Sequence, residues 1–178
     1  MASIGVRRFS IPLRLIAFPV RKAGFILEED ELDRWVYCRL AVYSTEIQLE
    51  TKGEQDVIDI TQQVEGRVKS SGVRQGLVTI FCPGSTAAVT TMEFEPGLVK
   101  DLPAALERVA PRKGTYQHQL KWHDDNGHSH VRGALFGPSI TLPVVDGSLP
   151  LGQWQQIVFL EFDARARQRR LIIQVVGD

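Results

Sequence analysis

Histidines are the residues of this chain best suited to chemistry, because they cluster. His123, His128 and His130 belong to one short segment, and His118 lies just upstream. A neutral imidazole is the commonest metal ligand, and its charge changes near neutral pH. The cluster therefore suits a metal site or acid/base catalysis, although we expect His123 to be a solvated loop residue.

The direction of these side chains depends on the local backbone, and we expect residues 128–134 to form a strand. Side chains alternate between the two faces of a strand. His128 and His130 would then share one face with Arg132, which would place a cation beside two imidazoles.

Carboxylates lie close to the histidines as well. The dipeptide Asn126-Gly127 favours a turn, which would bring Asp124 and Asp125 back toward the imidazoles. Glu93 is a further candidate, either as a metal ligand or as a carboxylate that orients an imidazole.

A catalytic metal site usually keeps about three protein ligands and one open position. The candidate ligands of a divalent metal ion are His118, His128 and His130, and the candidate catalytic residues are His118, His130, Glu93 and Asp125. Two alternatives stay open for the same residues. They can be hydrogen-bonded structural groups at a subunit interface, or they can catalyse proton transfer without a metal.

A small phosphorylated molecule would need N–H groups or cations to compensate its charge. The Gly84-Ser85-Thr86 segment offers backbone donors and hydroxyls, and an indole beside an amide can line a heteroaromatic pocket. The candidate substrate-binding residues are Gly84, Ser85, Thr86, Asn126, Arg132, Trp154 and Gln155. Simpler readings are a plain turn at Gly84, an ion pair for Arg132 and packing for Trp154.

Two other charged features lie near the C-terminus. Glu161 interrupts an apolar strand, where an unpaired charge would be costly, so we expect it to pair with a cation of the site or to lie at a water-exposed edge. A basic run follows, and we expect it to form a hairpin that faces water; it comprises Arg165, Arg167, Arg169 and Arg170.

Composition bounds the class of protein. The chain has 178 residues, of which 43% are hydrophobic, enough for one ordinary core. Its 21 basic and 21 acidic residues give a net charge of +0, so nothing favours nucleic-acid binding. Cys38 and Cys82 form no disulfide framework, and no apolar run approaches the roughly 20 residues of a membrane span. We expect a cytoplasmic protein with no membrane or nucleic-acid partner.

The pattern of elements favours an α+β fold with largely antiparallel sheets. A helix should begin at Asp59 or Thr61 and end before Gly72, and another should cover residues 98–109, with Pro103 starting or kinking a second segment. Strands are expected at residues 43–50, 76–82, 86–92, 140–145, 156–162 and 171–176, with the second and third as neighbours.

The first 41 residues differ from the rest. Residues 1–26 contain no acidic residue, and an arginine and two prolines interrupt their apolar run, which argues against a signal peptide. We expect residues 1–41 to be an N-terminal extension, poorly ordered or derived from a misassigned start, and residues 42–178 to be the domain.

Several motifs of this domain occur together and in order. They are Pro83-Gly84-Ser85-Thr86-Ala87-Ala88, Glu93, Tyr116-x-His118, Asp125-Asn126-Gly127-His128-Ser129-His130, Leu135-Phe136-Gly137-Pro138-Ser139, Pro143, Leu151-Gly152-x-Trp154-Gln155 and Arg169-Arg170. With these motifs, residues 42–178 resemble the YjbQ family, whose members are labelled secondary thiamine-phosphate synthases.

The resemblance implies two packed, mainly antiparallel β-sheets with a few helices, assembled as a homotrimer with the histidine site close to a subunit boundary. It also implies a weak transferase activity that joins the pyrimidine diphosphate and thiazole phosphate halves of thiamine. An alternative is a non-enzymatic trimer that binds a metal or a small anion. Gly84 stands where many members carry a histidine, so no role of that histidine carries over.

Overall fold

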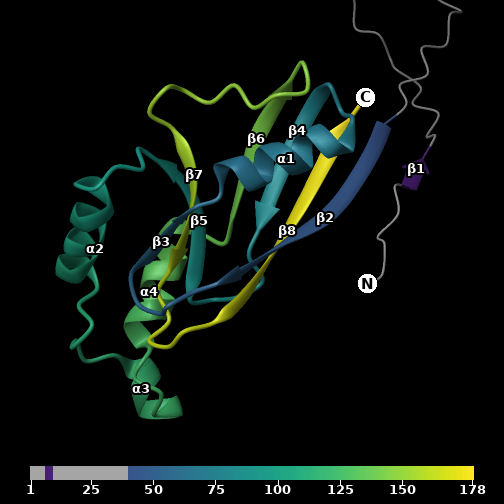
Figure 1. Ribbon diagram of the computed structural model, residues 1–178. Coiled ribbons are helices and arrows are strands. Elements are labelled where there is room, and N and C mark those ends of the chain that lie inside the picture. The colour runs from purple at the N-terminus through teal and green to yellow at the C-terminus, as the bar shows by residue number, and fades with distance from the viewer. Residues whose placement is uncertain (1–6, 10–39) are drawn as a thin grey trace, which may run out of the picture.

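Two antiparallel β-sheets form the framework of the protein (Figure 1). The computed structural model describes residues 7–9 and 40–178. The larger sheet has the strand order β1 (Arg7–Phe9), β2 (Leu40–Glu50), β8 (Gln168–Gly177), β4 (Gln75–Phe81) and β6 (Ser139–Val145). The smaller sheet has the order β3 (Asp56–Asp59), β7 (Gln156–Glu161) and β5 (Ala87–Met92). The α+β class expected from the sequence is confirmed.

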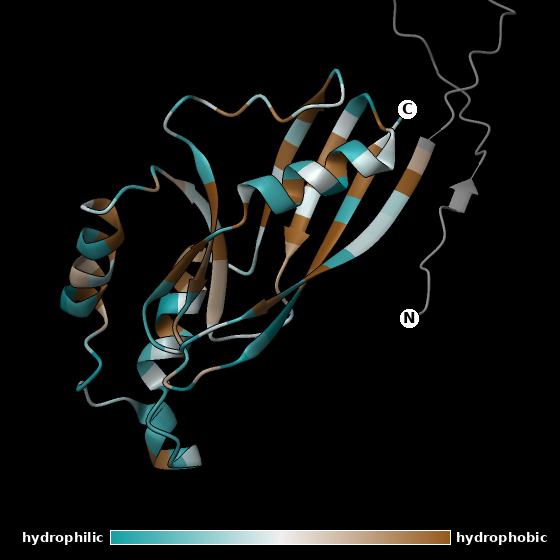
Figure 2. Ribbon diagram, in the orientation of Figure 1, coloured by the Kyte–Doolittle hydropathy of each residue, from teal (hydrophilic) through white to brown (hydrophobic). Residues whose placement is uncertain are grey.

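Strand β7 separates two clusters of buried apolar side chains. Its Ile157 and Phe159 belong to the larger core, whereas Val158 and Leu160 belong to a smaller core. Side chains of a strand alternate between its faces, so β7 is buried on both sides. Along β8 of the larger sheet the buried positions alternate, at Leu171, Ile173 and Val175, and in Figure 2 brown stretches broken by shorter teal or white bands run along the strands of this sheet.

Helix α1 (Thr61–Ser71) covers the inner face of the larger sheet, as its sequence predicts. Val64 and Val68 lie one turn apart and are buried in the larger core, while the Asp59 carboxylate accepts a hydrogen bond from the Thr61 N–H at 2.8 Å. The helix ends at Gly72, whose φ of 72° is left-handed, a conformation that glycine adopts without strain.

The expected strand over residues 128–134 is wrong, because residues Gly127–Phe136 form a helix, α4. The sequence shows no apolar periodicity over this helix, because buried positions are occupied by the polar residues His128, Ser129 and Arg132. Helix α3 (Gln117–Trp122) was not predicted.

Two further expectations about connections differ from the structure. Strands β4 and β5 follow one another in the chain but belong to different sheets, because the segment of residues 82–86 crosses from one sheet to the other. Helix α2 (Leu98–Val109) is continuous, with Pro103 inside it.

No helix among the described residues is long and apolar enough to cross a membrane.

Part of the expected N-terminal extension joins the larger sheet. Strand β1 pairs antiparallel with the start of β2, with Arg7 opposite Val42 and Phe9 opposite Leu40. The other residues before position 40 lie outside the described part of the chain, so the proposed order and origin of residues 1–41 stay predictions.

Two helical glycines give a matched test of the packing of α4. A Cβ at Gly133 would lie 2.8 Å from the carbonyl oxygen of Ser85, whereas a Cβ at Gly66 would meet nothing within 4 Å. We expect Gly133→Ala to lower the free energy of unfolding by about 1–3 kcal/mol. Gly66→Ala should raise it by about 0.5–1 kcal/mol. Urea unfolding of both variants measures this, and equal effects would contradict the packing described.

Candidate functional site

Helix α4 presents the two histidines of the HSH segment on different faces. A helix turns about 100° per residue, so residues two positions apart point in nearly opposite directions. His130 lies three positions before Gly133, which packs on the backbone of Ser85 and Ala87. His130 therefore faces the loop between β4 and β5, and His128 faces away from it.

His118 and His130 form the centre of the candidate site. Their ring centroids are 4.4 Å apart, with 44° between the ring planes. The Nε2 atom of His118 lies 3.6 Å from a carboxylate oxygen of Asp124. With its amide nitrogen turned toward these acceptors, Asn126 donates to Asp124 at 3.0 Å and to His118 Nε2 at 3.2 Å. A carboxylate and an amide thus orient one imidazole against the other.

The environment of His130 favours its neutral form. Burial lowers the pKa of His130 below its ordinary value, and the neighbouring His118 lowers it further, against smaller opposing effects of Asp124 and Asp163. Desolvation disfavours the charged imidazolium, and so does a second positive charge nearby. At neutral pH the His130 ring therefore has one nitrogen that accepts a proton and one N–H that donates.

His128 has different partners from this pair. Its side chain is 1% exposed, and its Nε2 lies 3.4 Å from Glu54 Oε1 and 3.3 Å from Ser129 Oγ. Burial is the main cause of the lowered pKa of His128, and Arg132 adds to it. Glu54 also pairs with Arg112 at 2.5 Å. His128 therefore belongs to a buried contact between α4 and the loop that precedes β3.

The three histidines do not assemble into one metal site in this chain. His118 and His130 are in contact, whereas His128 lies against Glu54. Among the residues that the structure describes, no three His, Cys, Asp or Glu side chains gather closely enough to hold a metal ion. The residues present therefore do not fit the expected three-histidine centre.

Arg132 is also placed differently from the prediction. The expectation that it shares a face with His130 is wrong, because the segment is a helix. The Arg132 guanidinium donates to the Ala110 carbonyl from Nε at 3.0 Å and from Nη2 at 2.8 Å, and to Glu107 at 2.5 Å. It is 1% exposed and closes the C-terminal end of α2.

Four other candidate residues have no described contact with the imidazole pair. Asp125 is exposed and has a φ of 53°, so it is Asp124 that reaches His118. Glu93 is exposed. Trp154 is 65% exposed, and the amide of its neighbour Gln155 donates to Thr91 at 3.2 Å.

The Gly84-Ser85-Thr86 segment lies beside α4. Gly84 and Ser85 are exposed, whereas Thr86 is buried. The Thr86 hydroxyl donates to Asp163 at 3.1 Å and accepts from Arg169 at 2.8 Å. Thr86 is therefore a structural anchor of the loop, and the two residues before it remain accessible.

A buried ion cluster below this loop contains residues that the sequence analysis did not assign to the site. Glu161 is 0% exposed and accepts two hydrogen bonds from Arg169, at 2.7 and 2.6 Å. The expectation that Glu161 has a cationic partner is confirmed. The expectation of a water-facing hairpin is wrong for Arg169, which is 11% exposed.

A signal for Arg169 was present in the sequence. In strand β8 the buried positions are Leu171, Ile173 and Val175, and Arg169 has the same parity. An inward-facing arginine at the end of such a strand needs a buried carboxylate. Glu161, in the apolar strand before it, was the matching candidate.

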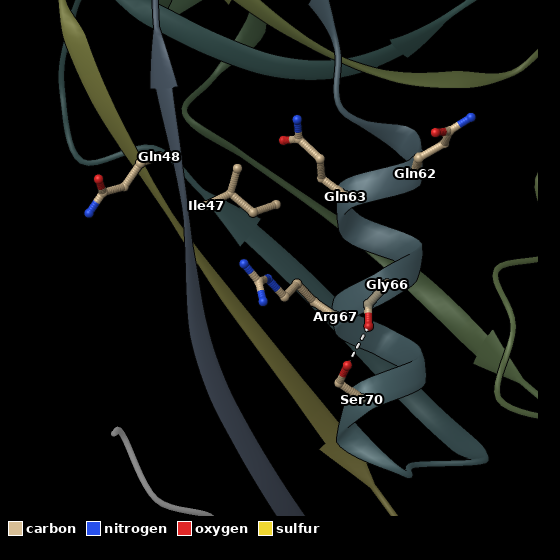
Figure 3. A pocket seen from close by; sticks show the side chains of 7 residues that line it. All are labelled: Ile47, Gln48, Gln62, Gln63, Gly66, Arg67 and Ser70. Carbon is tan, nitrogen blue, oxygen red and sulfur yellow. Dashed lines mark hydrogen bonds between the residues drawn. The ribbon is translucent and has the colours of Figure 1, made fainter. Parts of the chain in front are cut away.

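A separate pocket lies between α1 and β2 (Figure 3). Its volume is about 420 Å³, and its lining includes Gln63 and Arg67 of the helix and Ile47 of the strand. None of the candidate site residues lines this pocket, so it is not the site around the histidines.

Comparisons with known proteins agree with this architecture. Residues 45–178 match the family described as UPF0047 protein YjbQ-like. A UPF0047 protein of Methanothermobacter thermautotrophicus is 40% identical over 138 residues, which cover 78% of this chain and 94% of that protein. YugU of Bacillus subtilis is 34% identical over 133 residues, with 74% and 97% coverage.

A solved structure supports the same relationship. The YbjQ-like protein of unknown function from Sulfolobus solfataricus superimposes with a TM-score of 0.74 at 32% identity, over 78% of this chain and 99% of that one. Fold and site thus define an α+β protein in which an imidazole pair lies beside the crossing between two antiparallel sheets. The chain belongs to the YjbQ (UPF0047) family.

The buried histidines predict a pH dependence of stability. The pKa values of His128 and His130 are lowered in the folded protein, so the unfolded chain binds more protons as the pH falls below roughly 6.5. We expect the free energy of unfolding to fall between about pH 7 and pH 5, before most carboxylates titrate. Urea unfolding at several pH values measures this dependence.

A variant without one of these titrating groups should respond less. His128→Gln cannot take up the proton, so its stability should fall less with pH than that of the wild type. His123→Asn is the control, because His123 is exposed and asparagine tolerates its left-handed φ of 55°. An unchanged pH dependence in His128→Gln would contradict the assignment.

Proposed function

We propose that this protein is a transferase of the thiamine-phosphate synthase kind, which joins a pyrimidine diphosphate to a thiazole phosphate as a weak or secondary activity. The reacting centre is the His118–His130 pair. The observation that carries this proposal is the contact of the two rings at 4.4 Å, together with the lowered pKa of His130. The resemblance to the YjbQ family supplies the choice of reaction.

The chemistry of the reaction sets what the site must supply. A bond forms between the thiazole nitrogen and the pyrimidine methylene carbon, while the bond from that carbon to the diphosphate oxygen breaks. The diphosphate leaves with the electron pair. The site must therefore offer hydrogen-bond donors to developing negative charge and hold the two reactants in line.

The imidazole pair is suited to the first of these tasks. Each imidazole ring of the pair has an N–H group to donate to a diphosphate oxygen, and Asn126 and Asp124 lie against His118. The exposed Ser85 hydroxyl and the Gly84 backbone are further donors on the loop that α4 contacts.

Substitution of His130 tests the role of the pair. His130→Ala removes a donor that contacts the reacting group, so we expect formation of thiamine phosphate to fall about 100-fold or more. The variant should keep the melting temperature of the wild type within a few degrees, because His130 is only partly buried. The assay uses the purified full chain with both substrates.

His123→Asn is the matched control and should keep full turnover. Full turnover by His130→Ala would contradict the role of the pair. A wild-type protein that forms no product would contradict the transferase and favour the non-enzymatic alternative, a trimer that binds a metal or a small anion. Elemental analysis before and after dialysis against a chelator tests the metal form of that alternative.

We also propose that the protein is a homotrimer. The outer face of the larger sheet exposes apolar side chains on β4 and β6, among polar ones, and is not covered by a described helix: Leu77 is 53% exposed, Phe81 39% and Val145 44%. Thr79 and Thr141 lie between them and bond to each other at 3.0 Å. Large apolar side chains exposed near one another often mark interaction sites, and a second copy is the occupant that the family resemblance favours.

Light scattering after size-exclusion chromatography tests the trimer. The wild type should have three times the mass of the 19.9 kDa chain. Leu77→Glu places a charge in the buried interface and should give a monomer. Val109→Glu, at a residue that is 67% exposed on α2, should leave the mass unchanged. A monomeric wild type would overturn the proposal.

A further inference from the structure

Arg169 is held in a fixed position by two neighbours. Its Nε and Nη2 atoms donate to the two oxygens of Glu161 at 2.7 and 2.6 Å, and Nη2 also donates to the Thr86 hydroxyl at 2.8 Å. The third nitrogen, Nη1, has no hydrogen-bond acceptor among the described residues. One edge of a rigid guanidinium is thus available to another acceptor.

Gly84 leaves that edge open. A Cβ at position 84 would lie 3.2 Å from Arg169 Nη1, so any side chain there would approach the free nitrogen. The backbone of Gly84 is not left-handed, and its conformation therefore does not require glycine. Gly84 is also exposed and the Arg169 side chain keeps 11% of its surface exposed, so the approach from solvent to Nη1 runs past a residue without a side chain.

The loop offers a second set of donors at the same place. No described residue accepts a hydrogen bond from the backbone N–H of Gly84 or Ser85. Free backbone N–H groups close to a guanidinium are the kinds of donor that bind anions. Arginine adds planar donors that match the oxygens of a phosphate.

The charge of the cluster permits an anion at this edge. The carboxylates of Glu161 and Asp163 are balanced by Arg169 and Arg167, which lies 2.9 Å from Asp163. Both carboxylates face the Nε and Nη2 side of Arg169, so Nη1 presents positive charge toward the loop. Arg132, the cation expected for this role, is instead bound to Glu107 and Ala110.

We infer that Arg169 Nη1 and the backbone N–H groups of Gly84 and Ser85 form a binding site for a phosphoryl group. The site deepens the proposed function and rests on it only for the identity of the molecule that carries the phosphate. Its loop contacts Gly133 of α4, one turn from His130. A phosphate held there leaves the rest of the molecule beside the imidazole pair.

Phosphate titration of the full-length protein tests the site. Inorganic phosphate, pyrophosphate and a phosphate monoester are titrated separately by calorimetry, and sulfate serves as the competitor. Gly84→Val fills the space over Nη1 and should raise the Kd at least 10-fold for each phosphate. Gly66→Val, on the open surface of α1, is the control and should bind as the wild type does.

Substitution of Arg169 would itself weaken the fold, because Arg169→Lys leaves Glu161 with a poorer partner. A spectroscopic measurement therefore follows Arg169 without changing it. In protein labelled with ¹⁵N-arginine, phosphate should shift the side-chain signal of Arg169 in the wild type and not in Gly84→Val. Shifts confined to the exposed Arg165 or Arg170, equal binding by Gly84→Val, or no binding by the wild type would each overturn the inference.

The two proposals fail separately. His130→Ala should lose turnover and keep its affinity for inorganic phosphate, since His130 is not a ligand of the phosphoryl site. Phosphate binding that depends on Gly84, in a protein without transferase activity, would support the phosphoryl site and overturn the proposed reaction. Turnover that Gly84→Val leaves unchanged would overturn the phosphoryl site alone.

Discussion

The buried ion pair between Arg169 and Glu161 is the interaction on which the arrangement of the site depends. Glu161 ends β7 of the smaller sheet and Arg169 lies in β8 of the larger sheet, so the pair joins the two sheets. The same guanidinium bonds Thr86 and fixes the loop that crosses between them. Breaking a buried pair costs about 3–5 kcal/mol, because one charge is left without a partner.

Helix α4 places the polar residues of its segment on two opposite faces, which make different contacts. One face, with His128 and Arg132, packs against Glu54 and the end of α2. The opposite face, with His130, meets His118 and the crossing loop. The close approach at Gly133 allows this second contact, since any Cβ there would collide with the loop backbone. The helix thus buries one imidazole and holds another beside the crossing loop.

The sequence predicted the elements whose buried residues are apolar. The alternation in β2, the continuous apolar run of β4 and the four-residue spacing of Val64 and Val68 are direct consequences of burying apolar side chains. Helix α4 was missed because its buried face is made of polar residues, whose periodicity a hydrophobic pattern does not register. Because a strand was predicted here, the predicted face of Arg132 and the predicted common face of His128 and His130 were also wrong.

Other parts of the site depend on contacts between distant segments. The sequence names both His118 and His130 as candidates, and the structure brings their rings together. That Asp124 and not Asp125 approaches His118 depends on the local backbone, which the residue types alone do not fix. In the structure φ is positive at both His123 and Asp125. The cost of burying a charge predicts that Glu161 pairs with a cation. Identifying Arg169 as that cation requires knowing which alternate positions of β8 face the core.

Strand β7 carries a consequence for how the molecule opens. The two faces of β7 belong to two different cores. Loss of packing in either core would therefore expose a strand against which the other core also packs. Amide hydrogens of β7 should therefore exchange with solvent only through global unfolding, at the same free energy as those of β8. On this argument the two sheets open together as one cooperative unit.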